Sequence, residues 1–391
     1  MKTVLFSFFL ALAISSSAQS GFYTPWIGRS TGKLPALAYG LGEDRLGGAK
    51  MGYIDSNIAL RVMDTIQGMY LIQLSKFHQA FIEPQYVKAD SANSLKPWYL
   101  TGSISAKGDT TTFTDNIAVI MEEKLPYKSW MEINPSKIVV DIYGVQSNTN
   151  WITQLQTLEE VKNVYYQQVE DDVFRLIIEL KHQQHWGYSI SYVGKSLVVK
   201  VRRQPKIADL KKLRIAIDAG HGGTNSGATG IKAKASEKIY TLRFAKALQK
   251  QLKLKGVKDI IMTRTNDTTF DNKDRILWLQ EQKPDLVISL HLNSSSKEVI
   301  NGTSTYYKHI GFRPLTTAIL KRMLELKLSE FGNVGSFNFA LNSPTDFPNV
   351  LVEIAFLSNA ADEKKIISTK FHNDVATKIH LGLIDWLKNL K

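Results

Sequence analysis

Several residues able to do chemistry follow or interrupt short apolar segments in the C-terminal half of the chain. His221 follows the segment LRIAID within a Gly-rich turn, and His291 follows the segment DLVIS. Glu353 lies inside the segment VLVEIAF, where a carboxylate is costly unless it has a partner or a task. Because sites in open α/β sheets gather at the carboxyl ends of strands, we expect these side chains to converge.

The two histidines alone make an incomplete zinc site, because catalytic zinc usually takes three protein ligands and leaves the fourth position to water. Glu237 is the best third ligand, since it begins a predicted helix directly after the Gly-rich loop. A His–Glu–His set keeps the metal a strong Lewis acid that can ionise water near neutral pH. Each residue has a structural alternative: a turn position for His221, a strand end for His291, and a helix-dipole partner for Glu237. Their occurrence together favours one Zn²⁺ ion.

The segments around these residues alternate between strand-like and helical patterns. Helical spacing of apolar residues predicts helices, and short apolar runs bounded by turn signals predict strands. The predicted strands are 213–218, 257–264, 285–293 and 350–356, and the predicted helices are 236–254, 274–282, 315–328 and 374–390. This alternation is typical of an α/β domain with a mostly parallel sheet, which we assign to residues 211–391.

The N-terminal half is predicted to form all-β modules. Residues 22–39 lack periodicity and are interpreted as an extended lead-in, whereas short period-2 runs predict a small β-barrel at residues 40–90. A second β-rich block occupies residues 98–203, and residues 204–210 are interpreted as the linker to the α/β domain. The chain is therefore predicted to be multidomain.

Both β modules resemble known modules of cell-wall enzymes. Residues 47–53 (GGAKMGY) are similar to bacterial SH3-like modules, which implies an SH3-like barrel. The segments Lys137–Tyr143 and Phe174–Leu180 resemble the paired strands of the AMIN module. That resemblance implies a β-sandwich that localises a cell-wall amidase.

The first residues carry the pattern of an export signal. Lys2 precedes a short apolar run, and Ser16-Ser17-Ala18 provides a small-residue cleavage site, so residues 1–18 are predicted to be a signal peptide. The alternative is a buried N-terminal helix. No apolar run is long enough for a comfortable membrane helix, so we expect a secreted protein without a transmembrane anchor, periplasmic or wall-associated. The chain has no cysteine, which excludes disulfides and thiolate metal sites.

The positive charge is concentrated in the α/β region. From Lys211 onward, 28 lysines and arginines face 17 aspartates and glutamates, so this part carries +11 of the net charge of +13. Such a surface is drawn to polyanions, of which an exported protein meets anionic cell wall or membrane surface first. The alternative is that the charge serves solubility alone. We expect no nucleic-acid partner, because no recognisable nucleic-acid motif accompanies the charge.

Residues 213–390 closely resemble the zinc-dependent N-acetylmuramoyl-L-alanine amidases of the amidase type 3 family. The matching motifs are Asp218–Gly223 (DAGHGG), Ser236–Lys238 (SEK), Thr263–Arg264, Ser289–Asn293 (SLHLN) and Val352–Asn359 (VEIAFLSN). The resemblance assigns zinc to His221, Glu237 and His291, catalysis to Glu353, and the lactyl–L-alanine amide of peptidoglycan as the substrate. It implies a role in cell-wall remodelling or daughter-cell separation.

The chain departs from the family pattern at two places. Asn225 stands where the family commonly has aspartate, and Phe347–Val350 (FPNV) replaces the usual Pro-Ala-Val. Both lie outside the proposed ligand set, so they bear on substrate detail. The stretch between His291 and Glu353 is too short for the blocking helix of some relatives, so we expect an open groove. The need for a protein activator stays open.

Three further residues are predicted to contact substrate. Arg264 and Arg275 could anchor carboxylates of the stem peptide, since arginine binds carboxylates with two hydrogen bonds. Structural ion pairs with Asp267 or Asp274 are the alternative. Asn293 either orients substrate or caps a turn.

Three other functions compete with an amidase. A zinc peptidase acting within the stem peptide would use the same ligands on a different bond. A wall-binding or activator protein with a vestigial site would not need all four residues His221, Glu237, His291 and Glu353, which the chain retains. A nucleic-acid binder is suggested by charge alone.

Overall fold

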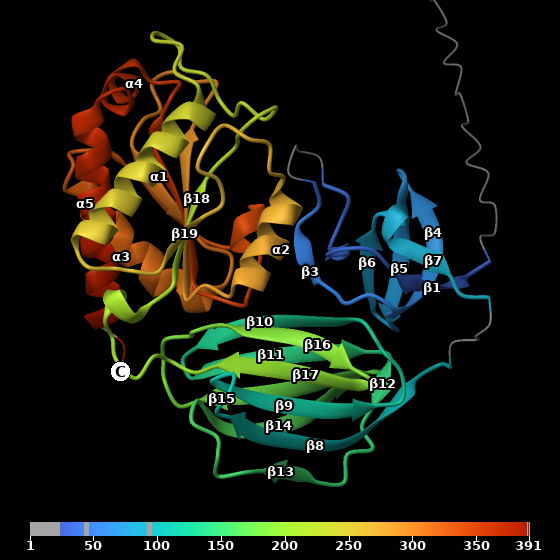
Figure 1. Cartoon of the computed structure of the whole chain (residues 1–391). Helices are drawn as coiled ribbons and strands as arrows, with labels where there is room; N and C mark the ends of the chain where they lie inside the picture. Colours follow the sequence, from blue (N-terminus) through green and yellow to red (C-terminus); the bar gives the residue numbers. More distant parts are fainter. Residues whose placement is uncertain (1–23, 43–46, 92–95, 389, 391) are drawn as a thin grey trace, which may run out of the picture.

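The chain forms a group of β-sheets followed by an α/β domain. The computed structural model describes residues 24–42, 47–91, 96–388 and 390, so the predicted signal peptide (1–18) lies outside the described residues. Figure 1 shows the α/β domain above a β-sandwich, with an N-terminal sheet beside both. In the described part of the chain, no helix is long and apolar enough to cross a membrane.

The N-terminal sheet contains seven strands in the order β3-β2-β6-β5-β4-β1-β7. Their bounds are β1 Trp26–Ser30, β2 Ala36–Ala38, β3 Lys50–Tyr53, β4 Ala59–Ile66, β5 Met69–Ser75, β6 His78–Ile82 and β7 Val87–Ala89. The predicted lead-in (22–39) thus supplies β1 and β2, so this sheet starts before residue 40. The lead-in interpretation was wrong because these two strands are too short to show periodicity, and pairing with β4, β7, β3 and β6 holds them in place.

Residues 99–202 form two sheets that share one core. One sheet has the order β10-β11-β15-β14, and the other has β12-β8-β9-β17-β16 with β13 beside β8. The bounds are β8 Tyr99–Asp109, β9 Thr114–Met121, β10 Tyr127–Ile133, β11 Ser136–Tyr143, β12 Val145–Gln146, β13 Ile152–Gln154, β14 Val161–Glu170, β15 Val173–Leu180, β16 Tyr188–Val193 and β17 Ser196–Arg202. The segments predicted as paired strands do pair, as β11 and β15.

The α/β domain is built on a six-stranded mixed sheet in the order β19-β18-β20-β23-β21-β22. Strands β19, β18, β20 and β23 run parallel, and β21 pairs antiparallel with β23 and parallel with β22. The strand bounds are β18 Ile215–Ala219, β19 Ile260–Met262, β20 Leu286–Asn293, β21 Thr303–Tyr306, β22 Glu330–Val334 and β23 Asn349–Phe356. The α-helices are α1 Glu237–Leu254, α2 Asn272–Gln282, α3 Arg313–Leu324, α4 Ala360–Ile366 and α5 Thr369–Lys388.

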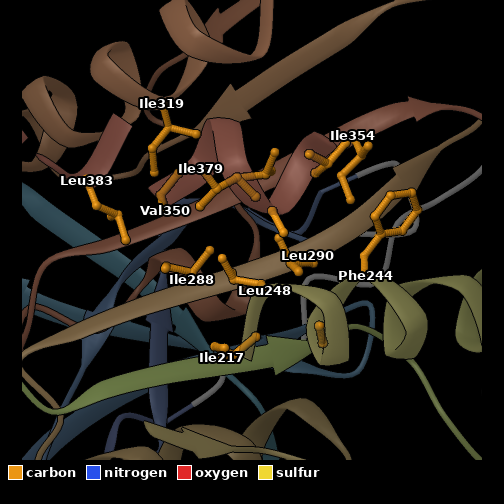
Figure 2. Close-up of a cluster of buried hydrophobic side chains, with 14 of the residues drawn as sticks. Ile217, Phe244, Leu248, Ile288, Leu290, Ile319, Val350, Ile354, Ile379 and Leu383 are labelled. Carbon is orange, nitrogen blue, oxygen red and sulfur yellow. The ribbon is translucent and has the colours of Figure 1, made fainter. Parts of the chain in front are cut away.

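Helices cover both faces of this sheet. Helices α1, α3 and α5 pack on one face, and Figure 2 shows part of the apolar core there, with Ile217, Leu248, Ile288 and Ile379 among its members. Helix α2 and the short 3₁₀ helix at Ala340–Asn342 lie on the other face over a smaller cluster. Burial of apolar surface stabilises the folded state by roughly 25 cal/mol per Å², so the packed sheet holds the side chains at its edge in fixed positions.

The β-sandwich is packed directly against the α/β domain. Trp186 of the sandwich belongs to the α/β core, where its ring stacks on Trp386 of α5 with centroids 5.1 Å apart. Arg202, at the end of β17, donates to the Pro284 carbonyl and pairs with Asp285. The predicted linker (204–210) therefore joins two parts that already share packing.

Candidate metal centre and its surroundings

The Gly-rich turn after β18 presents His221 at the carboxyl edge of the sheet. His221 has a φ of 61°, a left-handed conformation that is uncommon outside glycine. At Gly220 an added Cβ would lie 2.3 Å from the His291 ring, so only glycine lets that ring approach. The turn is therefore shaped to bring the two imidazoles together.

Glu237, the first residue of α1, is fixed by backbone donors. Its Oε1 accepts from Leu292 N at 3.0 Å, and its Oε2 accepts from Ala228 N at 2.8 Å. An added Cβ at Gly227, which has a φ of 66°, would lie 2.4 Å from Oε2, so glycine is required beside the carboxylate. The loop between His221 and Glu237 thus holds the carboxylate in one position.

A buried carboxylate of α4 holds the rest of this loop. Glu363 is 1% exposed and accepts from the backbone N–H groups of Lys232, Ala233 and Ala235. These contacts fix the segment that leads into Glu237. Each charge-assisted bond of this type is stronger than a neutral one, so the loop has few alternatives.

The three predicted ligands come together, and we call His221, Glu237 and His291 the ligand cluster. Glu237 Oε1 lies 3.0 Å from His221 Nε2 and 3.2 Å from His291 Nδ1. One potential ligand atom from each residue lies within 4.8 Å of the others. The side chains of His221 and His291 are 21% and 19% exposed, so solvent or a ligand can reach them.

Within the ligand cluster, the charge and hydrogen bonds of neighbouring residues shift the pKa values of Glu237 and His221. Burial raises the pKa of Glu237, but hydrogen bonds and charge from the two histidines outweigh it and hold that pKa well below its ordinary value. Burial lowers the pKa of His221, yet the hydrogen bond and charge of Glu237 leave it above its ordinary value. Two nitrogens and one carboxylate around one point are a donor set that suits Zn²⁺.

Asn225 orients His221. Its Oδ1 lies 2.9 Å from His221 Nδ1 and also accepts from Gly227 N at 3.2 Å. An amide oxygen accepts only, so it favours the tautomer with the proton on Nδ1 and the lone pair on Nε2. Asn225 therefore acts on the ligand cluster and not only on substrate detail, because contacts of this kind fix tautomer and ring orientation.

Glu353 lies on β23 beside the ligand cluster. In the sheet register it is opposite His291 of β20 on one side and Ser304 of β21 on the other. Its neighbours along β23 are all buried, and Glu353 itself is 6% exposed. Paired residues on adjacent strands project from the same face, so Glu353 and His291 share a face of the sheet.

Directly beneath the turn lies a second polar group, the buried arginine layer, which consists of Asp218, Arg264 and Arg275. Arg275 pairs with Asp218 and also donates to the Ala219 and His221 carbonyls. Asp218 also accepts from the Ser289 and Thr263 hydroxyls. Burial raises the pKa of Asp218, but the charge of Arg275 and these bonds bring it below the ordinary value.

The predicted substrate-binding role of the two arginines is not supported by this arrangement. Arg264 and Arg275 are 3% and 2% exposed. Arg264 donates to the Ala219, Gly220, Lys238 and Asn266 carbonyls and to the Thr241 hydroxyl. The structural alternative fits, but the partner of Arg275 is Asp218, which β18 places under the turn, and not Asp267 or Asp274.

Asn293 and one residue that the sequence did not single out lie next to Glu353. Asn293 Oδ1 accepts from Ser294 N at 2.8 Å, which is the turn-capping alternative. Burial, followed by the charge of Glu353, raises the pKa of the Tyr306 hydroxyl, and the Ser304 and Asn293 side chains offset part of that rise. Tyr306 was missed because β21 has four residues of mixed polarity, and no strand was predicted there.

Comparison with known proteins gives the class of the α/β domain. Residues 215–385 match the family model described as N-acetylmuramoyl-L-alanine amidase. These residues therefore form an amidase-type domain, which agrees with the expected resemblance.

Individual relatives share parts of the chain. The probable cell wall amidase LytH of Staphylococcus saprophyticus is 30% identical over 181 residues, covering 46% of this chain and 60% of LytH. The N-acetylmuramoyl-L-alanine amidase AmiC of Escherichia coli is 24% identical over 355 residues, covering 68% of this chain and 85% of AmiC. One solved structure is the catalytic domain of CwlV, an N-acetylmuramoyl-L-alanine amidase from Bacillus (Paenibacillus) polymyxa var. colistinus. It is 33% identical to this chain, and the match covers 44% of this chain and 97% of the CwlV domain, with a TM-score of 0.43.

Proposed function

We propose that this protein is a zinc-dependent N-acetylmuramoyl-L-alanine amidase, which hydrolyses the amide bond between N-acetylmuramic acid and L-alanine in peptidoglycan. The observation that carries the proposal is the convergence of His221, Glu237 and His291 beside Glu353. It occurs within the residues that match the amidase family model, and two named relatives, AmiC and CwlV, are described as amidases of this type.

His221, Glu237 and His291 would hold one Zn²⁺ ion. The fit rests on a shared point between two imidazole nitrogens and a carboxylate oxygen, with Asn225 fixing the tautomer of His221. When bound, zinc supplies a Lewis acid that makes water a better nucleophile and polarises a carbonyl oxygen. The partial exposure of both histidines leaves room for a substrate to approach the same point.

Glu353 acts as the general base and then as the general acid. Its carboxylate takes a proton from the attacking water and delivers a proton to the leaving amine of L-alanine. The second transfer is needed because an amide anion is a very poor leaving group. Proton transfer by a positioned side chain contributes about 10²–10⁴-fold to a rate. The position of Glu353 next to His291 in the sheet register supports this role.

The proposed setting is the cell wall of the organism that exports the protein. The predicted signal peptide and the relative described as a cell wall amidase support a secreted, periplasmic or wall-associated location. We infer that the SH3-like and AMIN-like modules localise the enzyme during wall remodelling or daughter-cell separation. A protein activator is compatible with this scheme, and the scheme involves no nucleic acid.

Mass spectrometry of purified peptidoglycan digested with the full chain tests the proposal. We expect intact stem peptides with a free L-alanine amine and glycan strands without peptide. A chelator should abolish both products, and added Zn²⁺ should restore them. Fragments cut within the stem peptide would instead identify a zinc peptidase, and no product under any condition would identify a non-catalytic wall protein.

Metal analysis tests the ligand cluster separately from activity. We expect about one zinc per wild-type chain, because structural and catalytic sites of this donor set take one ion. His221→Ala should bind far less zinc while its circular dichroism spectrum stays that of the wild type. Equal zinc content in this variant would remove His221 from the ligand set.

A further inference from the structure

A small cavity lies where the N-terminal sheet, the β-sandwich and the α/β domain meet. Its volume is about 110 Å³, and it is lined by residues of all three parts. The lysines among them are Lys50 at the start of β3, Lys128 of β10, and Lys308 after β21. We call Lys50, Lys128 and Lys308 the junction lysines.

Lys50 and Lys308 are held close to each other by contacts between the modules, and Lys128 lines the same cavity from β10. Lys308 Nζ donates to the Lys50 carbonyl at 2.9 Å. Asn338 ties the same strand to the α/β domain, since its Oδ1 accepts from Lys50 N at 3.2 Å and its Nδ2 donates to the Gly48 carbonyl at 3.0 Å. Lys128 Nζ lies 5.0 Å from the centre of the Trp130 ring and 5.9 Å from the centre of the Tyr39 ring.

Among the described residues, no carboxylate is within ion-pair distance of a junction lysine, whereas other lysines such as Lys238 and Lys378 have such partners. Asp346 lines the cavity, but its carboxylate accepts from Gln280, and burial raises its pKa. Glu83 acts on Lys50 from a distance and is outweighed there by burial and by the charge of Lys273. The cavity therefore carries excess positive charge.

This charge is only partly relieved by loss of protons. Burial, with the charge of Lys50, lowers the pKa of Lys308 to about 8, so the ammonium form still dominates at neutral pH. A buried charge is costly unless it is paired and hydrogen-bonded, and two like charges in one cavity add to that cost. An anion of suitable size would remove the cost.

We propose that the cavity is a binding site for one small oxyanion, a phosphate or a carboxylate group, held by the junction lysines. A volume of about 110 Å³ exceeds the roughly 30 Å³ share of one water, so an oxyanion fits with one or two waters. Because each lysine belongs to a different part of the chain, the bound oxyanion ties the three parts together. This site is separate from the ligand cluster and does not depend on its function.

Isothermal titration of the full chain with inorganic phosphate, and separately with acetate, tests this site. Chloride at equal ionic strength serves as the blank, so that screening is not mistaken for binding. We expect saturable binding to one site per chain for at least one of the two titrants, and the stronger titrant identifies the preferred oxyanion. Absence of binding of either at concentrations up to about 10 mM would overturn the proposal.

Variants locate the site. Lys308→Met should weaken binding at least tenfold, and Lys128→Met should weaken it to a smaller extent. Lys33→Met removes the same charge from an exposed position of the N-terminal part and should bind as the wild type does. Circular dichroism shows whether each variant folds. If Lys308→Met does not fold, Lys128→Met decides alone, because in the described structure the contacts of the Lys128 ammonium are with the Trp130 and Tyr39 rings, whose loss should leave the fold intact. Wild-type affinity in the folded variants would overturn the proposal.

Discussion

The ligand cluster and the buried arginine layer meet at the turn after β18, and both are polar, yet their side chains are arranged in opposite ways. In the ligand cluster, two half-buried imidazoles face one carboxylate oxygen, and both remain accessible. In the buried arginine layer, the guanidinium groups donate to Asp218 and to backbone carbonyls, and little surface remains. The difference indicates that one group is arranged for a ligand from outside, and the other for holding the turn that carries His221.

Replacing Arg275 should have the largest effect on folding. Arg275→Met leaves Asp218 buried without its cationic partner, and breaking a buried pair costs about 3–5 kcal/mol. Urea denaturation should show this loss in the free energy of unfolding. Arg322→Met, which removes a partly exposed ion pair with Asp385, should leave that free energy nearly unchanged. A stable Arg275→Met protein with reduced substrate affinity would restore the substrate-binding role predicted from the sequence.

Replacing Glu353 should affect turnover and little else. Glu353→Gln keeps the shape of the side chain but cannot accept a proton, so kcat on peptidoglycan should fall by about 10²–10⁴-fold. Zinc content and the free energy of unfolding should stay near the wild-type values, in contrast to Arg275→Met. Full activity in this variant would show that another group moves the proton.

Replacing Asn225 should have an intermediate effect, a loss of zinc affinity. Loss of a partner that orients a ligating histidine typically costs about 10–100-fold in metal affinity, so Asn225→Ala should weaken zinc binding to that extent. Competition with a coloured chelator measures it. Asn225→Asp keeps the acceptor for His221 Nδ1 and should retain tight binding. Equal affinities in all three proteins would mean that the contact with His221 does not matter.

The smallest expected effect is on the pH dependence of the free energy of unfolding, and it comes from Asp218 of the buried arginine layer. The folded-state pKa of Asp218 lies below the ordinary 3.8, so its contribution to stability is complete above about pH 4 and is lost as the pH falls through the folded value. Asp218→Asn should be less stable than the wild type at pH 7 because Arg275 loses its partner. Its free energy of unfolding should nevertheless fall less as the pH is lowered from about 5 to 2.5, because it has no carboxylate at this position to protonate. An identical decline in both proteins would assign the acid sensitivity to other groups.

Sequence patterns predicted those elements whose ends and apolar spacing are strong. Helix α1 begins at Glu237, one residue after the predicted start at Ser236, and ends at the predicted Leu254. Strands β21 and β22 and helix α4 were not predicted, since they are short, and the sheet and its neighbours determine them more than local preference does. The final helix starts at Thr369 and not at Asp374, and the turn that was missed contributes the buried Phe371 and His372.

In the site, too, some features could be predicted from local sequence patterns and others could not. The ligand cluster was predictable, since each member follows a glycine-rich or apolar signal that can be read locally. The roles of Arg264 and Arg275 were not, because burial of a guanidinium depends on which carbonyls the fold places around it. The partner of Arg275 is 57 residues away in the chain, a distance at which spacing carries no information.

The stacked pair Trp186–Trp386 affects how far the α/β domain can move away from the sandwich. A catalytic unit on a loose tether samples a sphere around its anchor, and tether length sets how much wall it can visit. Here the aromatic stack and the Arg202 contacts join the sandwich directly to the amidase-type domain, so the two are not connected by the linker alone. For the proposed amidase, the orientation of the sandwich on the wall would therefore set the position of the bond that is cut.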